Sequence, residues 1–114
     1  MSKVAISVLR GRLGLDASMD DRFGRAEAFL VVERETGEAI ETIDNASIGA
    51  SHGAGTAAAN MLRSAEVDAV ISGRFGPKAS DALRAHGIEA WIAPSGITAG
   101  EALRLLEHGD LNHG

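Results

Sequence analysis

The sequence predicts a single α/β domain with a mixed sheet, and three observations indicate this fold class. Short apolar runs rich in β-branched residues are typical of strands that are covered on both faces. In the second half of the chain, segments with helical spacing of apolar residues separate these runs. The length of 114 residues is enough for one hydrophobic core and too short for two ordinary domains. We expect residues 1–109 to form the domain and residues 110–114 to form a flexible tail.

The first half of the sequence predicts three strands. Residues 4–9 and 28–33 are almost continuously apolar, which is typical of central strands. Residues 39–44 alternate between apolar and polar side chains, as in a half-exposed edge strand. Because Thr36 and Gly37 form a turn signal between the last two runs, we expect these strands to pair as an antiparallel hairpin.

The second half alternates between helical and strand patterns. Small and apolar residues recur at helical spacing after Thr56. Pro77 favours the first turn of a helix, and Gly87 favours its end. Thr98 and Glu101 have the spacing of a capping box, which opens a last helix. The expected order is therefore βββαβαβα, with the later elements at residues 56–65, 67–71, 77–87, 88–93 and 98–109.

The connections between these elements predict the sheet topology. Two helical crossovers imply parallel pairing among the first, fourth and fifth strands, while the hairpin extends the other side of the sheet. We expect five strands in the order 3-2-1-4-5, with strand 2 antiparallel. This is the topology of the ribonuclease H-like three-layer α/β/α fold. In such a sheet a crevice lies at the carboxyl ends of strands 1 and 4, where the connections leave in opposite directions.

The charge distribution favours a small anionic ligand. The formal net charge of −5 argues against binding of nucleic acid or anionic membranes, because both need a basic surface. Basic residues nevertheless gather near two of the loops and after the first strand, where they could form a local basic mouth. These residues are Arg10, Arg12, Arg22, Arg25, Arg74 and Lys78.

The absence of cysteine limits how a metal could be bound. With no thiolate available, a metal or cluster would need histidine, carboxylate or backbone groups. The apolar run near the N-terminus is too short for a signal peptide or a membrane span, so we expect a cytoplasmic location.

Three glycine-containing loops predict an anion site, at residues 20–25, 51–56 and 72–77. Glycine allows backbone N–H groups to approach a ligand closely, and two of the loops lead into helices whose N-termini favour negative charge. The segment of residues 10–23 begins at one of the strand ends that border the expected crevice, residues 73–77 begin at the other, and the helix after Gly55 should point its N-terminus there. We therefore expect the three loops to meet there.

Three residues of these loops have two interpretations each. His52, one residue before the glycine-rich helix entry, is either a ligand or a loop residue that hydrogen-bonds its own turn. Phe23 and Phe75, each followed by glycine, either line the crevice or anchor their loops to the core, and the second interpretation is favoured. Both roles are compatible.

Other chemistries fit the sequence less well. The G-x-G-x-x-A pattern that starts at Gly53 does not follow the first strand by a tight turn, which a dinucleotide site requires. The first strand carries no carboxylate, which argues against nuclease or ATPase activity. Asp16, Asp20 and Asp21 lie just downstream and could in principle hold metal ions for hydrolysis, but a solvated acidic loop is the preferred interpretation.

The motifs, taken in order, resemble a known family. Similarity to the dinitrogenase iron-molybdenum cofactor biosynthesis family, which includes NifX-type and NifB C-terminal domains, runs along essentially the whole chain. It rests on residues 14–16, 22–26, 29–32, 51–55 and 72–79 and on Asn45. The resemblance implies a ribonuclease H-like fold without nuclease activity. It also implies a non-enzymatic nitrogenase accessory protein that binds or carries the iron-molybdenum cofactor or an iron-sulfur precursor, with other cofactor-assembly proteins as partners.

The resemblance also implies a set of binding residues. Where many members of the family have histidine before the Phe-Gly-Arg motif, this chain has Arg22, which leaves His52 as the main candidate metal ligand. A regulatory module that binds a small anionic metabolite without metal remains the alternative. The expected cofactor-binding residues are Arg22, Phe23, Gly24, Arg25, His52, Gly53, Gly55, Gly73, Arg74, Phe75 and Gly76.

Overall fold

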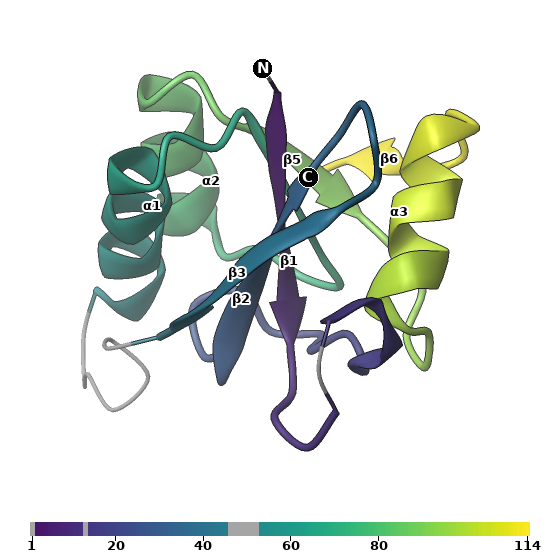
Figure 1. Ribbon diagram of the computed structural model, residues 1–114. Helices are drawn as coiled ribbons and strands as arrows, with labels where there is room; N and C mark the ends of the chain where they lie inside the picture. Colours follow the sequence, from purple (N-terminus) through teal and green to yellow (C-terminus); the bar gives the residue numbers. More distant parts are fainter. Residues whose placement is uncertain (1, 13, 46–52) are drawn as a thin grey trace.

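Three α-helices cover a six-stranded mixed sheet in the computed structural model, which describes residues 2–12, 14–45 and 53–114. Figure 1 shows α1 and α2 on one face of the sheet and α3 on the other. The strands are β1 (Lys3–Val8), β2 (Ala28–Glu33), β3 (Ala39–Asp44), β4 (Ala69–Ser72), β5 (Glu89–Ile92) and β6 (Asn112–His113). The helices are α1 (Ala54–Ser64), α2 (Pro77–Ala85) and α3 (Ala99–Glu107), with a short 3-10 helix, η1, at Gly14–Asp16.

The sheet order is β3-β2-β1-β4-β5-β6. β1 pairs in parallel with β4, and β4 with β5, whereas β2 is antiparallel to both β1 and β3. The expected order of the first five strands is therefore present, and so is the antiparallel second strand. The ends of β2 and β3 coincide with the predicted runs, which the turn at Thr36 and Gly37 separates.

The expectation of five strands is wrong, because the C-terminal residues add β6. Within residues 110–114, expected to form a flexible tail, Asn112 and His113 instead pair with the edge of β5, where His113 lies opposite Trp91. Leu111 is buried beside α3 in the core, and the Gly114 N–H donates to the Ala90 carbonyl at 2.9 Å. A two-residue strand shows no periodicity, so the sequence pattern could not reveal it.

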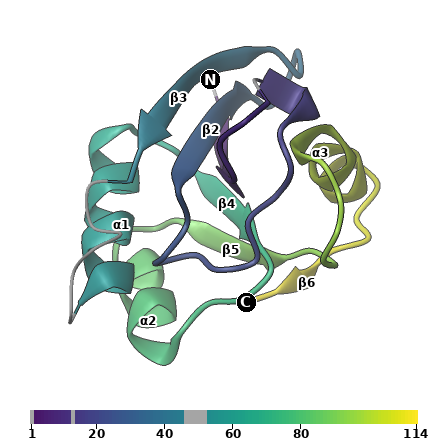
Figure 2. The same ribbon diagram turned by 90° about the horizontal axis from the view of Figure 1, so that it is seen from below.

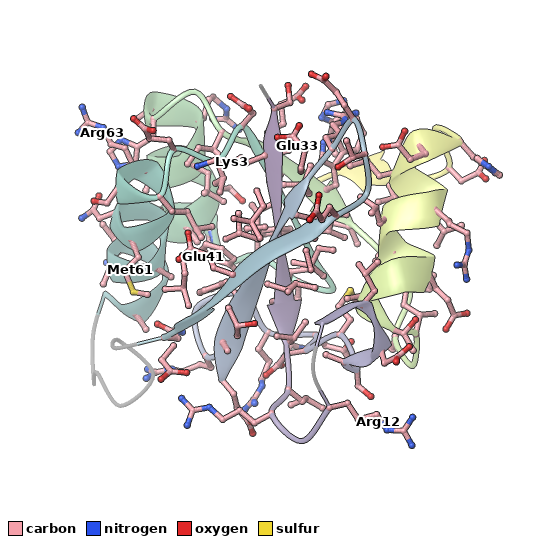
Figure 3. All side chains as sticks on the ribbon, in the orientation of Figure 1. Lys3, Arg12, Glu33, Glu41, Met61 and Arg63 are labelled. Atoms are coloured by element: carbon pink, nitrogen blue, oxygen red, sulfur yellow. The ribbon has the colours of Figure 1, made fainter. Side chains whose placement is uncertain are left out.

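Two hydrophobic clusters hold the layers together (Figure 3). On the side of α1 and α2, Phe29 and Val70 pack against Leu62 and Leu83 of the two helices. On the opposite face, Ile6, Leu30 and Ile71 pack against Leu103 and Leu106 of α3. Both faces of the central strands are thus covered, which explains their nearly continuous apolar sequence. No helix within the described part of the chain is both long enough and apolar enough to cross a membrane.

The predicted capping box at the start of α3 is confirmed. The Glu101 N–H donates to Thr98 Oγ1 at 3.2 Å, and the Thr98 N–H donates to Glu101 Oε1 at 3.1 Å. Thr98→Ala is expected to lower the free energy of unfolding by about 0.5–2 kcal/mol, because it leaves N–H groups of the first turn without this partner. Urea unfolding measures the change. Thr98→Ser, which keeps the hydroxyl, should remain close to the wild type, and equal stability of both variants would contradict the role of the cap.

Candidate functional site

The segment between η1 and β2 crosses the carboxyl ends of β1 and β4. Figure 2, which views the molecule from this end, shows it running across the sheet toward the N-terminal ends of α1 and α2. Asp20 is held by the main chain of β1, since its N–H donates to the Ser7 carbonyl at 2.8 Å. The Ser7 hydroxyl donates to the Asp20 carbonyl at 2.6 Å, and the Ser72 hydroxyl lies 3.2 Å from the same carbonyl oxygen. Ser7 and Ser72 thus fix the first predicted loop to both strand ends.

The first and third predicted loops pair directly with each other. Arg22 and Arg74 form a parallel bridge, in which the Phe23 N–H donates to the Arg74 carbonyl at 3.1 Å. Gly73 lies against Asp21 so closely that a Cβ at Gly73 would come within 2.9 Å of the Asp21 Cα. The two loops therefore form one layer across the end of the sheet.

The second loop joins this layer through its glycines. A Cβ on Gly24 would lie 2.8 Å from the backbone nitrogen of Gly55, so neither backbone could approach the other with a side chain between them. A Cβ on Gly55 would in turn lie 2.7 Å from the Ala79 Cβ in α2. The expected meeting of the three loops is therefore present for the residues described. His52 lies outside the described residues, so its role stays a prediction.

Phe23 and Phe75 connect the joined loops to the hydrophobic core. Phe23 is only 1% exposed, and its ring centroid lies 5.5 Å from that of Phe29 and 5.1 Å from that of Phe75. The anchoring interpretation therefore holds for Phe23. Phe75 is partly buried on the same cluster and also lines the surface hollow above it.

Two adjoining hollows lie over the joined loops. A basic hollow of about 460 Å³ includes Arg22, Arg74 and Phe75, and a helix-end hollow of about 410 Å³ lies between the first turns of α1 and α2. Both hollows are lined by Gly24, Arg25, Gly76 and Pro77. We call the two together the loop cleft. Lys78 and Thr56 also line it and were not among the predicted binding residues.

The N-terminal ends of two helices border the loop cleft. Gly53 is the N-cap of α1 with a φ of 71°, a left-handed conformation that glycine adopts without strain. Gly76 is the N-cap of α2, and Pro77 occupies the first turn, as predicted. Neither helix has an acidic residue in its first turn. The partial positive charge at both helix ends therefore faces the same cleft as the basic side chains.

Arg22 is oriented by a buried carboxylate. Asp20 is 3% exposed, and its Oδ1 accepts hydrogen bonds from the N–H and the Nε–H of Arg22, at 3.0 and 3.2 Å. Asp20 Oδ2 accepts from Arg22 Nη2 at 3.3 Å. This hydrogen bonding, and then the charge of Asp20, raise the pKa of Arg22 above its ordinary value, so the guanidinium stays charged at every physiological pH.

The basic mouth is smaller than the sequence suggests, because Arg10 and Arg12 lie elsewhere. Both line a separate, mainly apolar hollow of about 290 Å³ beside Val8 and Leu30. Arg10 forms an ion pair with Asp44 at 3.0 Å. The connection after β1 first turns toward η1 and returns to the strand end only at Asp20, which the spacing of charges along the chain could not reveal.

The acidic residues do not form a metal site among the residues described. Asp20 binds Arg22, and Asp16 lies in η1. No group of three or more histidine, cysteine or acidic side chains in the described ranges is placed to hold a metal ion. The preferred sequence interpretation, a solvated acidic loop, is wrong for Asp20, because its carboxylate is buried, at 3% exposure, and hydrogen-bonded to Arg22.

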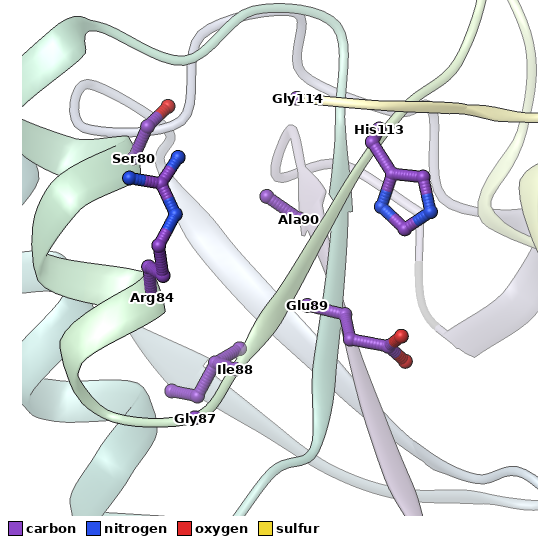
Figure 4. Close-up of a pocket in the computed structure, with 8 residues that line it drawn as sticks. All are labelled: Ser80, Arg84, Gly87, Ile88, Glu89, Ala90, His113 and Gly114. Carbon is purple, nitrogen blue, oxygen red and sulfur yellow. The ribbon is translucent and has the colours of Figure 1, made fainter.

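A further hollow, of about 380 Å³, lies between α2 and the β5–β6 edge (Figure 4). Figure 4 shows Arg84 extending from α2 toward Ser80, whereas the side chains of Glu89 and His113 point away on the other side of β5. Because its polar groups do not converge, we do not assign a ligand to it.

The serines at the strand ends are the part of the site that sequence analysis missed. Ser7 interrupts the apolar run of β1, Ser72 ends β4, and both are fully buried, with a hydrogen bond of 2.7 Å between their hydroxyls. A single polar residue within a buried strand was the available signal, since a buried hydroxyl needs a partner.

Comparison with known proteins finds two similar solved structures and one relative that is similar in sequence. The apo form of the orange protein from Desulfovibrio gigas superposes with a TM-score of 0.91 at 38% identity, over 100% of this chain and 93% of that one. A putative NifB protein from Thermotoga has a TM-score of 0.82 at 32% identity, over 99% and 93% of the two chains. An uncharacterised protein of Methanocaldococcus jannaschii is 32% identical over 113 residues, which cover 97% of this chain and 90% of the relative.

The family assignment follows from the match along the chain. Residues 3–109 match the family described as dinitrogenase iron-molybdenum cofactor, and this range contains every element from β1 to α3 as well as the loop cleft. The chain therefore belongs to the dinitrogenase iron-molybdenum cofactor family.

Proposed function

We propose that the protein is a non-enzymatic carrier that binds an anionic metal cluster, the iron-molybdenum cofactor or an iron-sulfur precursor of it, in the loop cleft. The observation that carries the proposal is the convergence of three glycine loops, two helix N-termini and four basic residues on one cleft. The basic residues are Arg22, Arg25, Arg74 and Lys78. The family match supports this choice of cargo.

The chemistry of the cleft suits a cargo that is held by its charge. Guanidinium groups and backbone N–H groups donate hydrogen bonds to anionic sulfur and carboxylate oxygen atoms. The chain has no cysteine, so it would not exchange its own thiolates onto the metal. A cluster bound mainly through its surface can be received and released without breaking a set of metal–thiolate bonds. This favours transient carriage between cofactor-assembly proteins.

Each predicted residue has a distinct role in the proposal. Arg22, Arg25 and Arg74 neutralise the charge of the cluster. Gly24, Gly55 and Gly73 allow the loops to pack closely, and Gly53 and Gly76 leave the backbone accessible to the ligand. Phe23 and Phe75 hold the loops on the core. His52 is proposed from the sequence as a metal ligand.

Anaerobic titration of the purified protein tests the cargo. The wild type is expected to bind isolated iron-molybdenum cofactor or a synthetic [4Fe–4S] cluster, with a change in the absorption spectrum. Arg74→Gln should weaken this binding about three- to tenfold, because a charge-assisted hydrogen bond at an exposed site is partly screened by solvent. His52→Ala should alter the spectrum of the bound cluster if the imidazole coordinates metal.

Arg84→Gln is the matched control for Arg74→Gln. It removes the same charge from the C-terminal part of α2, where Arg84 forms an exposed ion pair with Asp81 at 3.4 Å. Affinity should be unchanged in this variant. A wild type that binds none of these clusters would contradict the proposal, and equal losses in both arginine variants would argue against the loop cleft as the site.

A small anionic metabolite is the alternative ligand, because arginines and helix N-termini bind phosphate and carboxylate groups as readily. Thermal shifts with a panel of anionic metabolites in the presence of a metal chelator separate the two functions. Stabilisation that survives chelation favours the metabolite.

A further inference from the structure

We infer that Asp20 is a positioning residue for the ligand: its buried carboxylate fixes the Arg22 guanidinium at the rim of the loop cleft in the orientation that receives an anion. This inference rests on the proposed function and assigns a role within the same site. It gives an acidic residue a favourable part in binding an anion, which its charge alone would not suggest.

Asp20 is attached to the sheet through its main chain. Its main chain takes part in hydrogen bonds with Ser7, next to the last residue of β1, and with Ser72, the last residue of β4, at 2.6 to 3.2 Å. Ser7 and Ser72 are fully buried, and Asp20 is 3% exposed. The carboxylate is therefore carried by one of the most firmly supported points of the loop.

The Asp20 carboxylate fixes the position of the Arg22 side chain. The carboxylate accepts hydrogen bonds from Nε and Nη2 of Arg22, which fixes the plane of the guanidinium, and a third from the Arg22 N–H. Nη1 takes part in none of these bonds. The backbone of Arg22 is also paired with Arg74. A long side chain that is half exposed, at 50%, is thus ordered before any ligand arrives, and this reduces the entropy lost on binding.

The negative charge of Asp20 and its effect on the orientation of Arg22 predict opposite changes in ligand affinity. Asp20 places a negative charge next to a cleft that we propose for an anion, so removing this charge should strengthen binding if Coulomb attraction alone decides. If the orientation of Arg22 decides, the same change should weaken binding. The sign of the effect therefore distinguishes the two roles.

Asp20→Asn is the test, because asparagine has the same shape but its amide group would face the Arg22 donors with donors of its own. We expect a synthetic [4Fe–4S] cluster to bind this variant about tenfold more weakly than the wild type. Asp81→Asn, which makes the same charge change at an exposed ion pair in α2, should leave the affinity unchanged. In an Arg22→Gln background, Asp20→Asn should cause no further loss, because the residue through which Asp20 acts is gone.

Two further measurements keep the inference testable if Asp20→Asn folds poorly. Arg22→Lys keeps the positive charge but cannot pair with both carboxylate oxygens in a fixed plane, so it should weaken binding about as much as Asp20→Asn. In the ligand-free wild type, the Nε–H signal of Arg22 in the NMR spectrum should exchange with water more slowly than that of Arg34, whose ion pair with Glu107 is 3.9 Å long.

The outcomes separate this inference from the proposed function. Unchanged or tighter cluster binding by Asp20→Asn, or wild-type affinity in Arg22→Lys, would overturn the positioning role while the proposed function stands. An equal loss from Asp20→Asn with and without Arg22 would also overturn it. A wild type without affinity for any cluster would overturn the proposed function, and the role of Asp20 with it.

Discussion

Gly24→Ala is expected to destabilise the protein by about 1–3 kcal/mol and to distort the loop cleft, because the added methyl group has no room. Its Cβ would lie 2.8 Å from the Gly55 nitrogen and 2.9 Å from the Gly55 Cα. These are backbone atoms at the start of α1, so they cannot rotate away as a flexible side chain would. If the loop that contains Gly24 moved away from α1, the surface that lines both hollows would change shape. Urea unfolding measures the loss of stability, and cluster titration measures the loss of binding.

Gly76→Ala is the matched control. Gly76 lines the same cleft, but a Cβ there has no heavy atom within 4 Å, and its φ of −73° is allowed for any residue. Stability should stay within about 0.5 kcal/mol of the wild type, the usual range for a surface substitution. If Gly24→Ala were as stable as Gly76→Ala, the close contact between the loop and α1 would not be a structural requirement.

Phe23→Ala is expected to lower the free energy of unfolding by about 3–5 kcal/mol, a large part of the total for a domain of this size. The ring is 1% exposed and packs on Phe29 and Phe75, with centroid separations of 5.5 and 5.1 Å. Its removal leaves a cavity directly beneath Arg22 and Gly24. Cluster affinity should therefore also fall under conditions in which the variant remains folded.

Phe75→Ala provides the comparison for this prediction. Phe75 is only partly buried against the same cluster, so less apolar surface is lost and the destabilisation should be clearly smaller than for Phe23→Ala. Thermal and chemical unfolding of the two variants side by side give the ranking. A larger effect at Phe75 would show that the loop is anchored by the partly buried ring of Phe75 and not by the fully buried ring of Phe23.

Much of the fold could be predicted because local patterns and packing agree. The turn at Thr36 and Gly37 separated β2 from β3, and Pro77 and Gly87 bounded α2, so these limits were visible in the sequence. α1 begins at Ala54 rather than Thr56, since Gly53 adopts a left-handed conformation that only the three-dimensional structure reveals. β6 was missed because two residues carry no periodicity.

The candidate site was predictable in its loops but not in its internal contacts. The positions of Arg22, Arg74 and Gly76 follow from which strand ends adjoin, and topology rules supply that information. The partner of Arg22 does not follow from such rules, since Asp20 read as part of a solvated acidic loop. Arg10 was placed with the wrong group for a similar reason: nearness in sequence to the loop was taken for nearness in space.

The joined loops have a consequence for how such a protein could be adapted. Where Gly24 meets Gly55, main-chain atoms make the contact, so the shape of this part of the cleft depends little on the side chains that line it. The exposed side chains of Arg74 and Lys78 line the cleft, whereas Arg74 joins the loops through its main-chain carbonyl. Exchanging these two residues should therefore retune which anion is accepted while the scaffold beneath keeps its form.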